Sequence, residues 1–171
     1  MGGAKSNGSS RVGGGAVTAP AVSVAPTLPP GTEVESVGVN SSYYHRDSML
    51  DFNAYGHELT SGVHNITYEF TIEGDYGRYN PNDGTTATER VQTLAKVLKI
   101  AKYDVSTRPE GSIFHVSAST EDGSGASRAR AYAAFGFSQA REPGDIQYAI
   151  KRGGRLQPLS AYEFYQIANR S

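Results

Sequence analysis

The chain has 171 residues, the length of one domain of about 100–150 residues with an extension, and a formal net charge of -1. This charge balance gives no global attraction to nucleic acid or anionic lipid, and the lack of cysteine excludes disulfides and thiolate metal sites. No apolar run reaches the roughly 18 residues of a membrane span. Because Gly, Ser and Pro interrupt the N-terminal region, we expect no signal peptide.

Residues 1–33 form the predicted N-terminal arm. Glycine, serine, alanine, valine and proline dominate it as far as Gly31, with Lys5 and Arg11 as the only charges. Such a composition buries too little apolar surface to offset its ordering entropy, so the isolated arm is predicted to be disordered. Held by a neighbouring subunit, the arm could add an extended strand to a sheet edge. The small apolar residues that suit such a strand are Val17, Ala19, Ala21, Val22 and Val24.

Residues 34–64 carry no consistent period. The stretch is rich in Tyr, Asn, Ser and His, with only short apolar pieces. We interpret it as an irregular connecting segment with at most one short strand.

Residues 65–171 carry the clear signals of secondary structure. Apolar and polar residues alternate over 65–74, which predicts a half-buried strand. Thr86 with Glu89 forms a capping box, and an apolar face at helical spacing predicts a helix over 86–103. The expected elements that follow are a strand (112–120), a helix (127–135) closed by Gly136, a strand (145–151), a Gly153-Gly154 hairpin turn, and a helix opened by Ser160 with Glu163. This order predicts an α/β (α+β) fold, a mixed sheet with flanking helices.

The segment 129–137 reads Ala-Arg-Ala-Tyr-Ala-Ala-Phe-Gly-Phe. It resembles the Ala-x-x-Tyr-x-x-x-Gly-Phe helix of the GNAT acetyltransferase superfamily. The order of predicted elements over residues 65–151 is also similar to that family. The resemblance implies a GNAT-like sheet, acetyl-CoA as cofactor, and Tyr132 as the general acid that protonates the departing thiolate. A core tyrosine at helical spacing is the alternative interpretation of Tyr132.

The family binds the cofactor's pyrophosphate at the N-terminus of the central helix, with an Arg/Gln-x-x-Gly-x-Gly/Ala loop. Only Arg78, Gly84 and Ala87 are candidates here, and their spacing differs from the family's. Pro81 removes a donor and Asp83 places a negative charge where phosphates would sit. These departures favour a GNAT-like scaffold without acetyl transfer.

Other candidate sites are weaker. The four histidines lack paired ligand spacing, so we expect no metal. Several basic residues form either a modest surface patch or ordinary solvated positions, namely Arg128, Arg130, Lys151, Arg152 and Arg155. Glu69 and Glu73 lie on the polar side of a predicted strand, where solvated carboxylates are the default.

The leading hypothesis is a non-enzymatic structural or interaction protein of a larger assembly. An adhesive arm, a compact domain and eleven tyrosines with no tryptophan suit packing against partners. The overall character resembles a small tailed-phage virion protein (head, neck or tail) bearing a GNAT-like domain, homo-oligomeric and joined to other subunits through the arm. One alternative is an active N-acetyltransferase that uses acetyl-CoA in the cytoplasm. Another is a module that binds a small ligand or a peptide.

Overall fold

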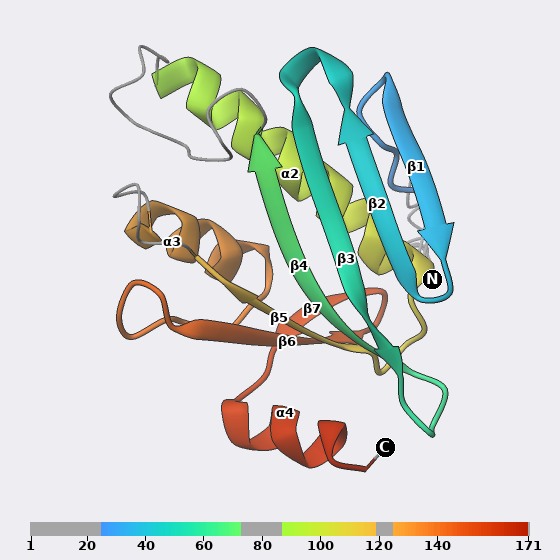
Figure 1. The fold of residues 1–171 in the computed structure, drawn as a ribbon. Helices are drawn as coiled ribbons and strands as arrows, with labels where there is room; N and C mark the ends of the chain where they lie inside the picture. The colour runs from blue at the N-terminus through green and yellow to red at the C-terminus, as the bar shows by residue number, and fades with distance from the viewer. Residues whose placement is uncertain (1–24, 73–86, 119–124, 171) are drawn as a thin grey trace, which may run out of the picture.

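The computed structural model describes residues 25–72, 87–118 and 125–170. Within these residues the fold is α+β, a seven-stranded mixed sheet with α-helices on both of its faces (Figure 1). The strands are β1 (Thr32–Val37), β2 (Asn40–His45), β3 (Leu50–Glu58), β4 (His64–Ile72), β5 (Ile113–Ser117), β6 (Ile146–Arg152) and β7 (Arg155–Pro158). The helices are α2 (Ala87–Thr107), α3 (Gly125–Phe135), α4 (Ala161–Ala168) and the 3-10 turn η2 (Arg46–Ser48).

The strands follow one another across the sheet in chain order, and every neighbouring pair is antiparallel except β4 and β5. A parallel pair needs a crossover connection, and α2 lies in the one between β4 and β5. Only three residue pairs join these two strands, from Asn65 with Ile113 to Thr67 with His115. Beyond them the strands diverge, so that β1–β4 and β5–β7 form two wings of one sheet (Figure 1).

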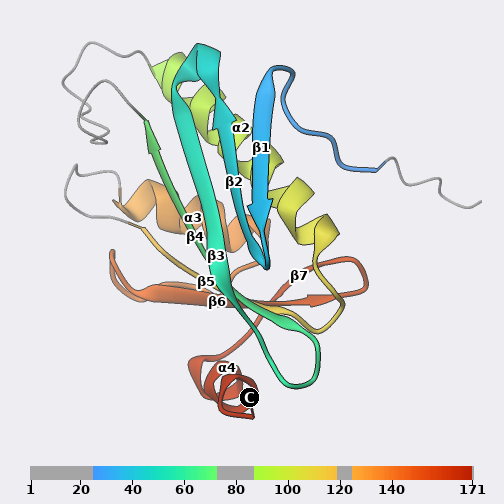
Figure 2. The same cartoon turned by 45° about the vertical axis from the view of Figure 1, so that its right-hand side comes forward.

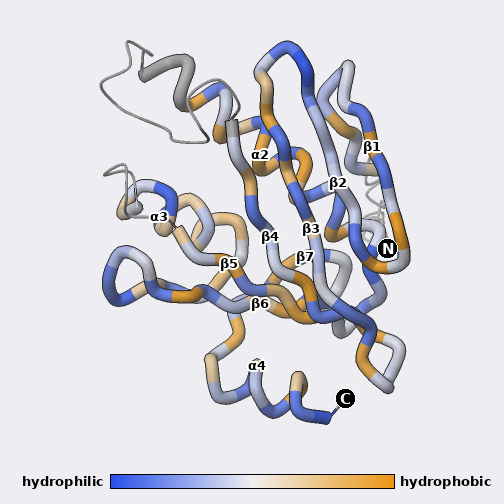
Figure 3. Tube along the Cα trace, in the orientation of Figure 1, coloured by the Kyte–Doolittle hydropathy of each residue, from blue (hydrophilic) through white to orange (hydrophobic). Residues whose placement is uncertain are grey.

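Two apolar clusters hold the wings together. The main core lies between the sheet and the helices α2 and α3, around the fully buried Phe52, Ile100 and Phe114. A smaller core lies under α4, where Phe164 packs on β5 and β6. Figure 3 shows the apolar residues interleaved with polar ones along the strands, as a sheet with unlike faces requires.

Residues 34–64 correct our interpretation of an irregular segment, because they contain most of β1 and all of β2 and β3. Tyr43 and His45 are buried on β2, and Phe52 and Ala54 on β3. Asp51 and Asn53 flank Phe52, and both residue types are depleted in strands. Cross-strand pairing and packing on α2 therefore decide this region rather than local propensity.

The arm also ends earlier in the sequence than the predicted residue 33. β1 starts at Thr32, and the Thr32 hydroxyl donates to the carbonyl of Pro29 over 2.6 Å. Pro29 is buried, and Leu28 packs against the main core. Residues 28–33 thus belong to the domain, whereas 1–24 lie outside the described residues.

The elements predicted after residue 65 are present in the expected order. At the end of α3, Gly136 has a φ of 131°, and the Phe137 amide donates to the Tyr132 carbonyl over 3.0 Å. This is a glycine C-cap with its hydrophobic residue packing back. The capping box of Ser160 and Glu163 opens α4 as predicted. The capping box proposed for Thr86 and Glu89 lies outside what the structure describes.

Candidate functional site

Tyr132, the candidate general acid, lies inside the main core. It is 6% exposed, and its ring meets Phe137 edge to face with centroids 6.3 Å apart. Burial raises the pKa of the Tyr132 hydroxyl to about 12, against a smaller opposing effect of Arg128. The hydroxyl is therefore protonated at neutral pH, as both a core tyrosine and a general acid would be.

The space beside Tyr132, where β4 and β5 diverge, is filled by side chains. Phe70 of β4, Phe135 of α3 and Phe137 line what remains, a cavity of about 20 Å³. Ligand pockets usually measure about 300–1,000 Å³, so this cavity holds little more than one water molecule. The guanidinium carbon of Arg128 lies 5.2 Å from the centre of the ring of Phe70, one of the residues that line the cavity.

The candidate cofactor loop is not part of this picture. Arg78 and Gly84 lie outside the described residues, and Ala87 is the first residue of α2. Glu69 is exposed on β4, where its carboxylate raises the pKa of Tyr55 to about 12 by hydrogen bonding.

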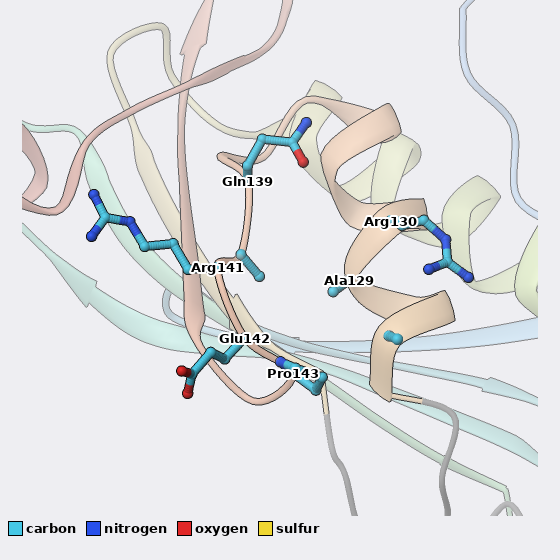
Figure 4. Close-up of a pocket in the computed structure, with 8 residues that line it drawn as sticks. Ala129, Arg130, Gln139, Arg141, Glu142 and Pro143 are labelled. Atoms are coloured by element: carbon cyan, nitrogen blue, oxygen red, sulfur yellow. The ribbon is translucent and has the colours of Figure 1, made fainter.

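A shallow groove of about 170 Å³ lies between α3 and the loop of residues 139–143 (Figure 4). Small side chains, among them Ala126 and Ala129, line the helix side. The charged ends of Arg141 and Glu142 point away from the hollow in Figure 4. The loop itself is held by Asp145, whose carboxylate accepts the backbone amides of residues 141 and 142 over 3.0 and 2.9 Å. The groove is thus of mixed character: Ala126, Ala129, Ala140 and Pro143 line it together with the polar Arg130, Gln139, Arg141 and Glu142.

The sequence analysis missed an ionic centre at the base of the main core. Asp104 is fully buried and accepts the hydroxyls of Tyr43 (2.6 Å) and Tyr68 (2.7 Å). Arg108 donates to both carboxylate oxygens through Nε (3.0 Å) and Nη2 (2.9 Å). The i, i+4 spacing of Asp104 and Arg108 was the available signal, but it does not distinguish a buried pair from a surface one. Each carboxylate oxygen of Asp104 accepts two hydrogen bonds. This centre therefore holds α2 to β2 and β4 and exposes no reactive group.

Three of the four histidines hydrogen-bond within the domain, and the fourth, His57, is exposed. His45 hydrogen-bonds to Ser48 and to the Pro30 carbonyl, and His115 Nε2 lies 2.6 Å from the Thr67 hydroxyl. The guanidinium of Arg108 donates to Nδ1 of His64, so that nitrogen carries no proton. Burial lowers the pKa of both His64 and His115, with Arg108 adding to the effect at His64. Among the described residues no group of acidic or histidine side chains could hold a metal ion.

The suggested basic patch loses one member. Lys151 is 7% exposed, and its ammonium donates to the Arg108 carbonyl over 2.6 Å, just past the end of α2. It therefore caps a helix end, where a cation is favourable. Arg152 and Arg155 remain exposed beside the hairpin turn.

Within the described residues no helix covers the outer face of β1–β4, which we call the open face. Register and alternation place Glu33 and Glu35 of β1, Tyr44 of β2, and Asp51 and Tyr55 of β3 on it. The helices α2 and α3 lie on the opposite side, and α4 packs mainly on β5 and β6 (Figures 1 and 2). Arg46 pairs with Glu33 at its border over 3.1 Å. Acidic and aromatic groups thus face solvent with little positive charge beside them.

Comparison with protein-family models, with curated proteins and with solved structures found no match to this chain. None of the helices in the described part of the chain has the length and apolar character needed to cross a membrane.

Proposed function

We propose that the chain is a non-enzymatic structural subunit of a larger assembly, a bacteriophage virion component that joins neighbouring subunits through residues 1–24. The supporting observation is the contrast between its interior and its surface. The space beside Tyr132 is filled by aromatic rings, whereas the open face carries exposed Tyr55 and a half-buried Tyr44 without a covering helix. Tyrosine is enriched at protein interfaces because it combines large area with a polar tip.

The physical state of the chain in its native source tests this proposal. After gentle lysis, sedimentation should place the chain in a large particle at a fixed copy number. Recovery of the chain only as a small free species would contradict the proposal. The particle fraction also identifies the neighbouring subunits by mass spectrometry.

An acetyl-CoA-dependent N-acetyltransferase is the second candidate. It is favoured by Tyr132, which combines a motif position with a hydroxyl that stays protonated at neutral pH. Because the apolar cavity beside it is about 20 Å³, we expect no measurable binding of acetyl-CoA in calorimetric titration. A micromolar dissociation constant, about -8 kcal/mol, would restore the enzyme hypothesis. Tyr132→Phe should then lower turnover while leaving binding nearly intact, with exposed Tyr162→Phe as the control.

A binding module without turnover is the third candidate, and the groove beside α3 is its site. At about 170 Å³, the groove suits only a small ligand or one peptide side chain. Ala129→Leu would fill it, so a ligand bound there should be lost in that variant.

A further inference from the structure

The strand β1 forms one outer edge of the sheet. It pairs with β2 over all six of its residues, and no described residue pairs with its other side. An edge strand presents alternate N–H and C=O groups that a further strand can bind. Five of its six residues are exposed, including Val34 at 47% and Val37 at 70%. Backbone groups and apolar side chains are therefore both accessible along this edge.

Charge argues against a second copy of β1 as the occupant. Glu33 and Glu35 lie on the same face of the strand. Antiparallel pairing of two copies would gather four carboxylates on one face of a short two-strand interface, and like charges across a strand pair are destabilising. The edge therefore favours an uncharged or basic strand.

Residues 16–25 have that character. They read Ala-Val-Thr-Ala-Pro-Ala-Val-Ser-Val-Ala and contain no charge. Between Pro20 and Pro26 the valines and small residues alternate with a period of two, and proline is tolerated at the first residue of a strand or on an edge. Lys5 and Arg11, further upstream, add positive charge that complements Glu33 and Glu35.

The course of the chain disfavours pairing with its own β1. Residues 28–31 are fixed by the burial of Pro29, the packing of Leu28 and the bond from Thr32 to the Pro29 carbonyl. From there the described chain runs away from β1 rather than back along it (Figure 2). The connection left free between residue 25 and the fixed Leu28 is residues 26 and 27, which span at most about 7 Å when extended. A receiving edge must therefore belong to a close neighbour.

We infer that residues 16–25 of one copy add as an eighth strand to the outer edge of β1 in an adjacent copy. The inference rests on the proposed assembly function and names its contact. Main-chain hydrogen bonds supply the affinity, and Val22 and Val24 pack beside Val34. Repeated from copy to copy, this head-to-tail contact closes into a ring or continues as a filament.

Cysteine cross-linking of the full-length chain tests the contact, since the natural chain has no cysteine. One tagged population carries a single cysteine at position 21, 22, 23 or 24, and an untagged population carries Glu35→Cys. The two are mixed, assembled and oxidised. We expect disulfide-linked dimers of one tagged and one untagged chain. They should form with every second cysteine position of the arm, because alternate residues of a strand face the same side. The matched control is Gln157→Cys on β7, the outer strand at the other edge of the sheet, which should give none.

Hydrogen exchange on the unlabelled chain provides a second measurement that needs no cysteine. Assembly should slow exchange of the outward-facing β1 amides by about tenfold or more. Val22→Pro should abolish that protection, whereas Ser9→Pro in the same arm should keep it.

Three outcomes would overturn the inference. Cross-links to β7 alone, in a chain that still assembles, would leave the proposed function intact and refute β1 as the receiving edge. A disulfide formed within one molecule that carries both Ser23→Cys and Glu35→Cys, without dimers, would assign the arm to its own domain. A chain found free in its native source and monomeric at all concentrations would refute the proposed function as well.

Discussion

Asp104 and Arg108 form a buried ion pair, and the stability of the core depends on both partners being present. Both side chains are almost inaccessible, at 0% and 3% exposure, and two tyrosine hydroxyls share the carboxylate. A buried pair often contributes little net stability, but removing one partner leaves an uncompensated charge in the core. The pair therefore makes the core sensitive to single substitutions.

Asp104→Ala should destabilise the domain by about 3–5 kcal/mol. It strands the Arg108 guanidinium and removes the acceptor of Tyr43 and Tyr68. Urea unfolding measures the difference. The matched control is Glu33→Ala, which breaks the exposed pair with Arg46 and should cost about 0–1 kcal/mol. Equal effects of the two variants would refute the buried ionic centre.

Two half-buried histidines, His64 and His115, predict a stability that falls in mild acid. The folded state lowers the pKa of His64 and His115, so it binds fewer protons than the unfolded chain. Their stabilising contribution is fully present above a pH of about 6.5, the pKa of histidine in the unfolded chain. It is lost as the pH falls below that value towards the lower pKa of the folded state. Urea unfolding at pH near 7.5 and near 5.5 should show the loss. His115→Gln should make the dependence shallower, and exposed His57→Gln should leave it unchanged.

At the scale of elements, the close approach of β3 and β4 depends on Gly56. A Cβ at this position would lie 1.8 Å from the Asn65 carbonyl oxygen of β4. Neither backbone can move without breaking the ladder from Leu50 to Glu58, so Gly56→Ala should cost about 1–3 kcal/mol or more. Thermal unfolding measures the cost. Gly38→Asn is the control, because that position has φ 61° with nothing within 4 Å, and asparagine tolerates this conformation.

Elements with a strict period were predictable from the sequence, and the others were not. The strand β4 alternates regularly, and the ends of α3 and α4 carry the glycine cap and the capping box that mark helix termini. By contrast, β2 buries Tyr43 and His45 on either side of the half-buried Tyr44 in a polar stretch, and β1 is exposed over most of its length. Such strands are stabilised by pairing with neighbouring strands of the sheet, and a local sequence pattern carries no information about those neighbours.

The candidate site shows the same division. The helix that carries Tyr132 was predictable from its alanine spacing and its terminal glycine. The ring contacts that fill the space beside it join residues from β4, α3 and the segment after it, at separations that no local motif records. Asp104 likewise meets Tyr43 across 61 residues of chain.

At the scale of the whole molecule, the domain and the preceding residues have separate roles in this account. Residues 25–170 contain both apolar clusters, and the described chain closes its core from Leu28 onward. The first 24 residues add two positive charges and the small apolar stretch that suits a neighbour's sheet edge. Stability should therefore reside in the domain, and assembly in the arm.

The most direct measurement is the copy number that a chain truncated to residues 25–171 reaches in the native assembly, taken together with its melting temperature. The truncation retains Leu28, which packs against the main core, and Pro29, which is buried. We predict a melting temperature within about 2 °C of the full chain, because the lost residues contribute less than about 0.5 kcal/mol to the fold. We also predict that incorporation is abolished. Incorporation at the normal copy number, or unfolding of the truncated chain, would contradict the account.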